Sequence, residues 1–158
     1  MTTTLTAQPG YATPTAPPPR RPLITLWLLR IALTALALAA MAQPVIAGRY
    51  LSGDFDALVV HAANAALVML TVLGALGAAV LYCAAGRGAG WPALTLAGMF
   101  VAVIAQAALG ALRVLAIHIP LGVLIGAVAV GLAVWSFRPS ALRTRSPRVR
   151  PTQQEVPR

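Results

Sequence analysis

The segment ALVVHAANAALVMLTVLGALGAAVLY, residues 57–82, decides the fold. It contains no Asp, Glu, Lys or Arg. About 20 apolar residues are enough to cross the hydrocarbon core of a bilayer, at a rise of about 1.5 Å per residue. The segment therefore predicts a transmembrane helix.

Three further segments on either side have the same character. We expect spans at about 23–46, 91–112 and 117–137, in addition to the one at 57–82. Short connections place consecutive helices side by side and antiparallel. The predicted fold class is an all-α membrane protein, with a four-transmembrane-helix up-down bundle over residues 23–137.

The two ends of the chain differ from the spans in composition. Residues 1–22 are rich in Thr, Ala and Pro, and residues 138–158 are rich in Arg, Pro, Ser and Gln. Neither shows apolar periodicity, so we predict a disordered lead and a disordered basic tail. A signal peptide cleaved near Ala40-Met41-Ala42 is an alternative for the first span, but the long lead and Arg30 argue against it.

The net positive charge of the chain does not indicate a nucleic-acid partner. Of the 158 residues, 59% are hydrophobic and 9% are charged, and the net charge is +9. The positive charge is carried almost wholly by the chain ends, and no folded basic module accompanies it. We therefore expect no nucleic-acid partner; the partners expected are the lipid bilayer and, at the basic tail, anionic lipid head groups.

The arginines predict the orientation in the membrane. Arg49 and Arg113 lie on one side of the predicted bundle. Because positive residues favour the cytoplasm, we predict a multi-pass plasma-membrane protein with both termini cytoplasmic. The arginines on the side of the termini are Arg20, Arg21, Arg87, Arg138, Arg143, Arg145, Arg148, Arg150 and Arg158.

The two histidines of the chain, His61 and His118, stand near the starts of the second and fourth spans. These helices run in the same direction, so both imidazoles are expected at one depth near the extracytoplasmic face. On diagonal helices of a bundle they can ligate one metal centre, and a b-type haem with two axial histidines is the natural candidate. The ligating nitrogens are then about 4 Å apart, twice an ordinary metal–imidazole distance.

The residues around the histidines repeat, since the order Gln, Gly, Arg, His occurs twice. Parallel two-helix repeats generate a pseudo-twofold axis along the membrane normal, with a ligand pair at its centre. We expect the arginines to pair with haem propionates and the glutamines to reach the macrocycle. The candidate cofactor-binding residues are His61, His118, Arg49, Arg113, Gln43, Gln106 and Gly110.

Each of these residues also has a plainer interpretation. The arginines can be interfacial anchors, the glutamines can join helices by hydrogen bonds, and the glycines can be packing positions. Pro120 bears on the depth of His118, because proline is best tolerated in the first helical turn. An N-cap position for His118 is therefore an alternative, and it makes this imidazole a few Å shallower than that of His61.

The segments MAQPVIAGRYLSGDFDALVVH (41–61) and AQAALGALRVLAIHIPLGVLIG (105–126) resemble one four-helix half of the haem A synthase family. The resemblance covers about residues 23–137 and implies a four-helix bundle with His61 and His118 as axial ligands. Gln106, with Leu109 and Gly110 after it, matches the family's third-helix pattern. The chain also resembles small four-span membrane proteins of no assigned activity, which share AG-x-x-L-S-G and the two histidines.

The departures from the synthase family bear on function. The family carries a glutamate three residues before its second-helix histidine, where this chain has Leu58, and it uses two bundles instead of one. No Asp or Glu lies within a predicted span, so we assign no catalytic residue and expect no haem oxidation. We predict electron transfer or haem handling, with a membrane redox partner or a second copy of the chain. The alternative is a cofactor-free structural or accessory subunit with interfacial histidines.

Overall fold

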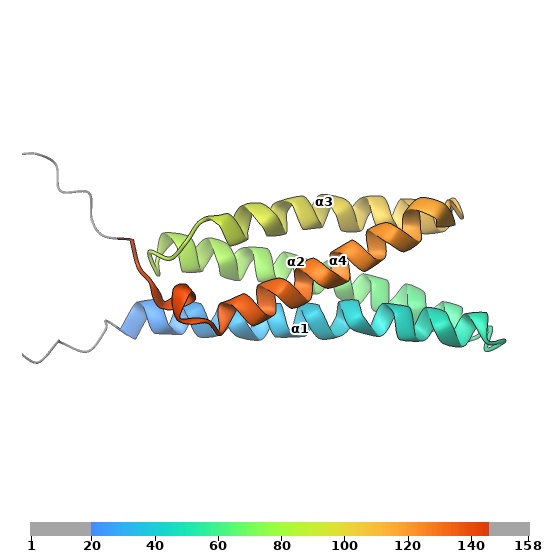
Figure 1. Cartoon of the computed structure of the whole chain (residues 1–158), viewed down its shortest axis with the longest axis horizontal. Helices are drawn as coiled ribbons and strands as arrows, with labels where there is room; N and C mark the ends of the chain where they lie inside the picture. The colour runs from blue at the N-terminus through green and yellow to red at the C-terminus, as the bar shows by residue number, and fades with distance from the viewer. Residues whose placement is uncertain (1–19, 146–158) are drawn as a thin grey trace, which may run out of the picture.

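The computed structural model describes residues 20–145, with side chains from residue 23 onward. The predicted disordered segments therefore lie mostly outside the described residues. Successive helices run antiparallel and leave both ends of the described chain at the same end of the bundle (Figure 1). Four helices, α1 (Arg20–Leu51), α2 (Ala57–Ala84), α3 (Trp91–Ala111) and α4 (Leu115–Ser136), precede the short 3-10 helix η1 (Pro139–Leu142).

The four α-helices form the predicted membrane bundle. Each is long and apolar enough to cross a membrane, which confirms the all-α four-helix fold class. Helix α1 packs on α2, α2 on α3, α3 on α4, and α4 returns to α1. Within residues 20–145 the pairs α1–α3 and α2–α4 make no such contact, so they lie diagonally across the bundle. The two histidine-bearing helices, α2 and α4, are one of these diagonal pairs.

Buried residues recur along each helix at alternating steps of three and four. This spacing directs one seam of every helix toward its neighbours, as in left-handed helical bundles. Large side chains on the outer faces, such as those of Ile31 and Leu70, are about two-thirds exposed and form the surface that lipid covers. The seams are Leu26, Leu29, Leu33 and Leu36 on α1; Val68, Val72, Ala75, Ala79 and Tyr82 on α2; Pro92, Leu96, Met99 and Val103 on α3; and Ile125, Ala129, Leu132 and Ser136 on α4.

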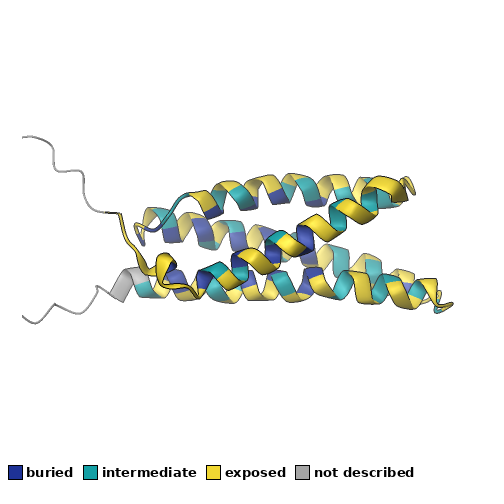
Figure 2. Cartoon of the chain, viewed as in Figure 1, coloured by how far each residue is buried: buried dark blue, intermediate teal, exposed yellow. Residues whose placement is uncertain are grey.

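These seams run from the end of the bundle that holds the chain ends to about its middle (Figure 2). Beyond Ala40, Val68, Val103 and Ile125, toward the opposite end, Ala57 is the one buried residue among those that the structure describes. Helix α4 crosses the bundle obliquely, so that its C-terminal end lies against α1 and its N-terminal end lies toward α3 (Figure 1). We call the two halves the closed half and the open half.

The closed half orders the beginning of the C-terminal tail. The buried Tyr82 hydroxyl donates a hydrogen bond to the carbonyl of Ala141, at 2.7 Å, and Ala141 is itself buried. Gly88 makes room for this arrangement, since a Cβ there would overlap the Tyr82 ring. The prediction of a disordered tail from residue 138 was therefore wrong for residues 138–145. Residues 146–158 lie outside the described part of the chain.

Arg30, the charged residue inside the first predicted span, also has its partners in the closed half. Its Nε donates a hydrogen bond of 2.9 Å to the carbonyl of Ser136, the last residue of α4. Its guanidinium lies 4.8 Å from the ring centre of Trp27 and 5.1 Å from that of Phe137. A cation at a helix C-terminus meets carbonyls that the helix leaves unpaired, so Arg30 fastens α1 to the end of α4.

Three helices are longer than predicted, and one of them, α2, continues past the predicted end at residue 82 to Ala84. Helix α1 begins at Arg20, inside the predicted disordered lead, and continues past the predicted end at residue 46 to Leu51. Helix α4 begins at Leu115, so the His118 N–H bonds the Val114 carbonyl at 3.0 Å and His118 lies within the first turns of the helix instead of at its N-cap. A helix can extend beyond the hydrocarbon because its backbone hydrogen bonds stay internal.

Candidate functional site

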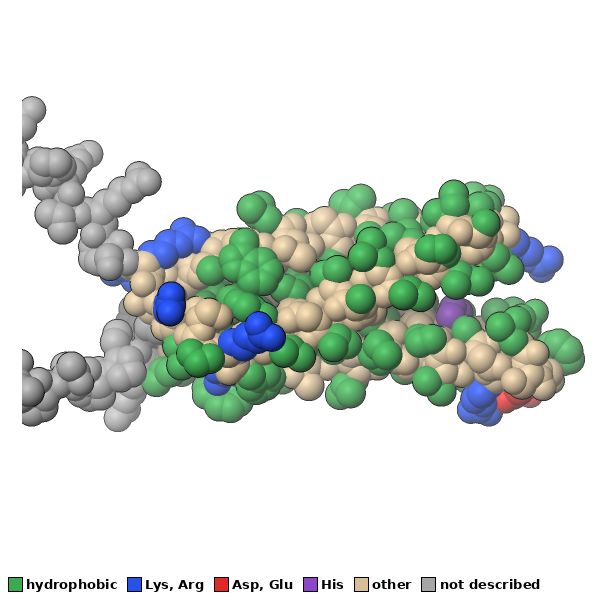
Figure 3. Space-filling model, in the orientation of Figure 1, with side chains coloured by type: hydrophobic (Ala, Val, Ile, Leu, Met, Phe, Trp, Pro, Cys, Tyr) green, Lys and Arg blue, Asp and Glu red, His purple; other side chains and the backbone are tan. Residues whose placement is uncertain are grey.

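The open half of the bundle surrounds a cavity of about 720 Å³ that residues of all four helices line. This volume is within the range of about 300–1,000 Å³ that is usual for small-molecule and cofactor sites. The space-filling view shows a histidine side chain in the cleft between α1 and α4 (Figure 3). Much of the lining is small, with Ala47, Ala62, Ala65, Ala66, Ala107 and Ala111 contributing.

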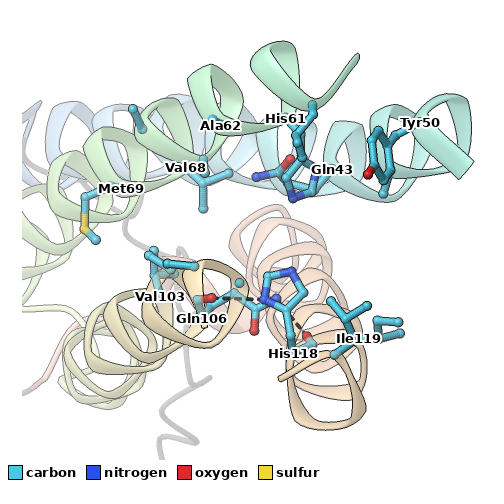
Figure 4. Close-up of a pocket in the computed structure, with 18 of the residues that line it drawn as sticks. Gln43, Tyr50, His61, Ala62, Val68, Met69, Val103, Gln106, His118 and Ile119 are labelled. Carbon is cyan, nitrogen blue, oxygen red and sulfur yellow. Dashed lines mark hydrogen bonds between the residues drawn. The ribbon is translucent and has the colours of Figure 1, made fainter. Parts of the chain in front are cut away.

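His61 of α2 and His118 of α4 face each other across this cavity (Figure 4). Their ring centroids are 6.3 Å apart, and their planes are inclined at 51°. In a five-membered ring with bonds of about 1.33 Å, each atom lies roughly 1.1 Å from the centre. Two imidazole nitrogens bound on opposite sides of one ion, at about 2 Å each, put the ring centres about 6.2 Å apart. The observed separation fits one metal ion between the two rings.

His118 is held in place by α3. Its Nδ1 lies 3.0 Å from the backbone carbonyl oxygen of Gln106, which can only accept, so Nδ1 carries the proton and Nε2 keeps the free lone pair. The Gln106 side chain in turn donates to the His118 carbonyl at 2.8 Å. A Cβ on Gly110 would stand 2.9 Å from Cε1 of His118, so only glycine lets the ring lie this close to the α3 backbone.

Polar atoms without partners gather in the same cavity. Nδ1 of His61 lies toward the backbone of Gln43 but outside hydrogen-bond geometry. The side-chain oxygens of Gln43 and Gln106 are also buried without a partner, and no other side-chain N or O among the described residues is in this state. Unpaired buried polar atoms cost free energy, so their gathering in one cavity indicates a place for a ligand or for water.

The structure brings five of the predicted site residues to the cavity and leaves the two arginines outside its lining. Arg49 is exposed and forms an ion pair with Asp54, in the turn between α1 and α2. Arg113 lies exposed in the turn between α3 and α4, where its φ is +57°. The predicted pairing of the two arginines with haem propionates stays a prediction. The residues that the cavity does unite are Gln43, His61, Gln106, Gly110 and His118.

Other residues that line the cavity were not predicted from the sequence, although helical periodicity could have identified them. Ala47 and Tyr50 follow Gln43 by four and seven residues, and Met69 follows His61 by eight. Residues at these separations share one face of a helix. Leu58, noted above only as a departure from the synthase family, also lines the cavity.

The donor set of the described residues suits haem better than a protein-only metal cage. Residues 20–145 contain no group of three or more His, Cys, Asp or Glu side chains that could hold a metal ion. Tetrahedral zinc sites use three or four such ligands. Haem iron needs at most two ligands from the protein, because the macrocycle supplies the other nitrogens.

Comparisons of the chain with family models, with curated proteins and with solved structures find no match. The resemblance to the haem A synthase family therefore remains a prediction from the segments quoted above. Any functional assignment has to come from the cavity and its two histidines.

Proposed function

We propose that this membrane protein binds one b-type haem between His61 and His118 and serves in electron transfer or haem handling. The observation that supports the proposal most directly is the 6.3 Å separation of two imidazoles that face each other across the cavity. When bound, the haem supplies a one-electron carrier whose potential depends on its ligands and on the surrounding polarity.

The residues of the cavity have distinct roles in this proposal. His61 and His118 bind the iron, and Gln106 orients His118 through its backbone carbonyl. The alanines of the lining leave room for a flat macrocycle, and the apolar walls keep water from the site. With His61 and His118 both holding it, the haem group would favour one-electron transfer.

We assign the open half, and with it the haem, to the side of the plasma membrane opposite the cytoplasm. The arginines at the two ends of the bundle support this orientation, because Arg87, Arg138, Arg143 and Arg145 lie at the closed end, and Arg49 and Arg113 at the open end. The apolar outer faces contact the lipid bilayer. A membrane redox partner, a second copy of the chain and anionic lipid head groups at the basic tail are proposed as further partners.

Visible spectra of the protein purified in detergent test the proposal. In the reduced protein, supplied with haemin if necessary, we expect a sharp alpha band that both His61→Ala and His118→Ala abolish. Gly131→Ala is the control, because a Cβ at this position meets nothing within 4 Å. A wild-type protein that stays colourless with haemin would contradict the proposal and favour the cofactor-free accessory subunit.

A further inference from the structure

We infer that the two histidines are unequal ligands, with His118 as the fixed ligand and His61 as the exchangeable one, so that a small uncharged molecule can bind the iron on the His61 side. This inference rests on the proposed haem site and adds to it a second binding function. It comes from the different ways in which α1 and α3 support the histidine that follows them.

The support of His118 has three parts that act together. The hydrogen bond from Nδ1 to the Gln106 carbonyl fixes the ring and raises the basicity of Nε2. The Gln106 amide holds the His118 backbone from the other direction. Two glycines leave the space that these contacts need. Gly110 has no side chain to collide with the His118 ring, and a Cβ on Gly122 would lie 2.7 Å from Gln106 Nε2.

The corresponding support of His61 is incomplete. Gln43 stands on α1 where Gln106 stands on α3, but Nδ1 of His61 approaches the Gln43 backbone without the regular hydrogen-bond geometry that His118 has with Gln106. Four residues after the glutamine, α3 has Gly110 whereas α1 has Ala47, which lines the cavity. A methyl group therefore stands on α1 at the position where α3, beside His118, has none. A ligand without a partner on its second nitrogen is less well oriented and binds iron less tightly.

The space around His61 suits a small uncharged ligand. Ala47, Ala62 and Ala65 line the cavity beside it, so a tilted imidazole meets little bulk. No Asp, Glu, Lys or Arg side chain lines the cavity, so a charged molecule would find no ion-pair partner beside His61. The cleft between α1 and α4 gives access from outside (Figure 3). Carbon monoxide and free imidazole are suitable probes of this side.

Variants of the two histidines give opposite expectations. We expect His61→Gly to keep its haem, to bind carbon monoxide when reduced, and to regain a wild-type-like spectrum with added imidazole. We expect His118→Gly to retain at least about tenfold less haem, because loss of the ligand should cost no less than loss of the partner that supports it. Haem per chain and carbon monoxide titrations are the measurements, with circular dichroism and gel filtration in detergent as checks of folding.

A second set of variants tests the support without removing a ligand. Gly110→Ala displaces the His118 ring, so we expect faster loss of haem to a haem-scavenging protein. Gly98→Ala is the matched control on the same helix, since its Cβ meets nothing within 4 Å. Ala47→Gly removes a methyl group from α1, so that His61 has a glycine beside it as His118 has Gly110. We expect this variant to bind carbon monoxide more weakly than the wild type. If His118→Gly does not fold, these glycine and alanine variants still test whether the two histidines are unequal ligands.

The possible outcomes separate the inference from the proposed function. Equal haem loss in both histidine variants, or equal behaviour of Gly110→Ala and Gly98→Ala, would overturn the inequality while the wild-type spectrum still supports the haem site. A wild-type protein that takes up no haem would overturn both.

Discussion

Gly122 illustrates how one absent methyl group can define a site. It lies one helical turn before Gly126, and the pair matches a small-xxx-small packing motif of membrane helices. The two glycines nevertheless differ in the structure. A Cβ on Gly126 would make only an ordinary contact, 3.7 Å from the sulfur of Met41, whereas one on Gly122 would press on the amide that holds His118.

Gly122→Ala should therefore destabilise the protein, whereas Gly126→Ala should not. Loss of the Gln106–His118 hydrogen bond, with Gln106 left in a buried site, should lower the free energy of unfolding by about 1–2 kcal/mol. Gly126→Ala should be neutral or slightly stabilising, since alanine favours a helix over glycine by up to about 1 kcal/mol. Unfolding by SDS, followed by circular dichroism, measures both. Equal midpoints would contradict this explanation.

The sequence predicted that the two histidines lie at similar depth, but it did not predict which residues contact and support them. Two histidines near the starts of parallel helices must lie at similar depth, because helix geometry fixes the height of each residue. Arginine side chains are long and flexible, and Arg49 pairs with the nearby Asp54 instead of reaching the cavity. The seat of His118 on Gly110 depends on how closely α3 and α4 approach, which no local pattern reports.

Among the elements, helices were predictable and their ends were not. A long apolar stretch must form a helix in a membrane because its backbone groups need internal partners. The end of α1 at Leu51 and the start of α4 at Leu115 lie where interfacial residues permit either state. Helix η1 depends on a hydrogen bond between residues 59 apart in sequence, Tyr82 and Ala141, and composition alone does not report such a contact.

Tyr82→Phe should release η1 from the closed half. The variant leaves the Ala141 carbonyl without its donor, at a cost of about 1 kcal/mol, which corresponds to about a fivefold change in an equilibrium. Cys83, the only cysteine of the chain, reports the release because Arg145 of the same segment contacts its sulfur at 3.5 Å. We expect a maleimide to react with Cys83 about fivefold faster in the variant. Tyr50→Phe, in the open half, is the control and should leave the rate unchanged.

The molecule as a whole combines a packed half with an open half, and more of its described arginines lie at the closed end than at the open end. The seams of all four helices meet in the closed half, where Arg30 and η1 add further contacts. In the open half the helices separate around the cavity, and α4 approaches α3 instead of α1 (Figures 1 and 2). The membrane orientation therefore decides which compartment the cavity faces.

Cysteine labelling of whole cells tests this orientation. In a Cys83→Ala background, we expect a membrane-impermeant maleimide to label Ser52→Cys on intact cells, because the exposed turn between α1 and α2 lies at the open end. Ser140→Cys, exposed at the closed end, should react only after the membrane is permeabilised. The reverse pattern would place the cavity on the cytoplasmic side.

The unequal division of packing also bears on how the bundle holds together. Most of the contacts that hold the four helices together lie at the closed end of the bundle, whereas the cavity lies at the open end. The four helices can therefore hold one another in place whether or not the cavity is filled.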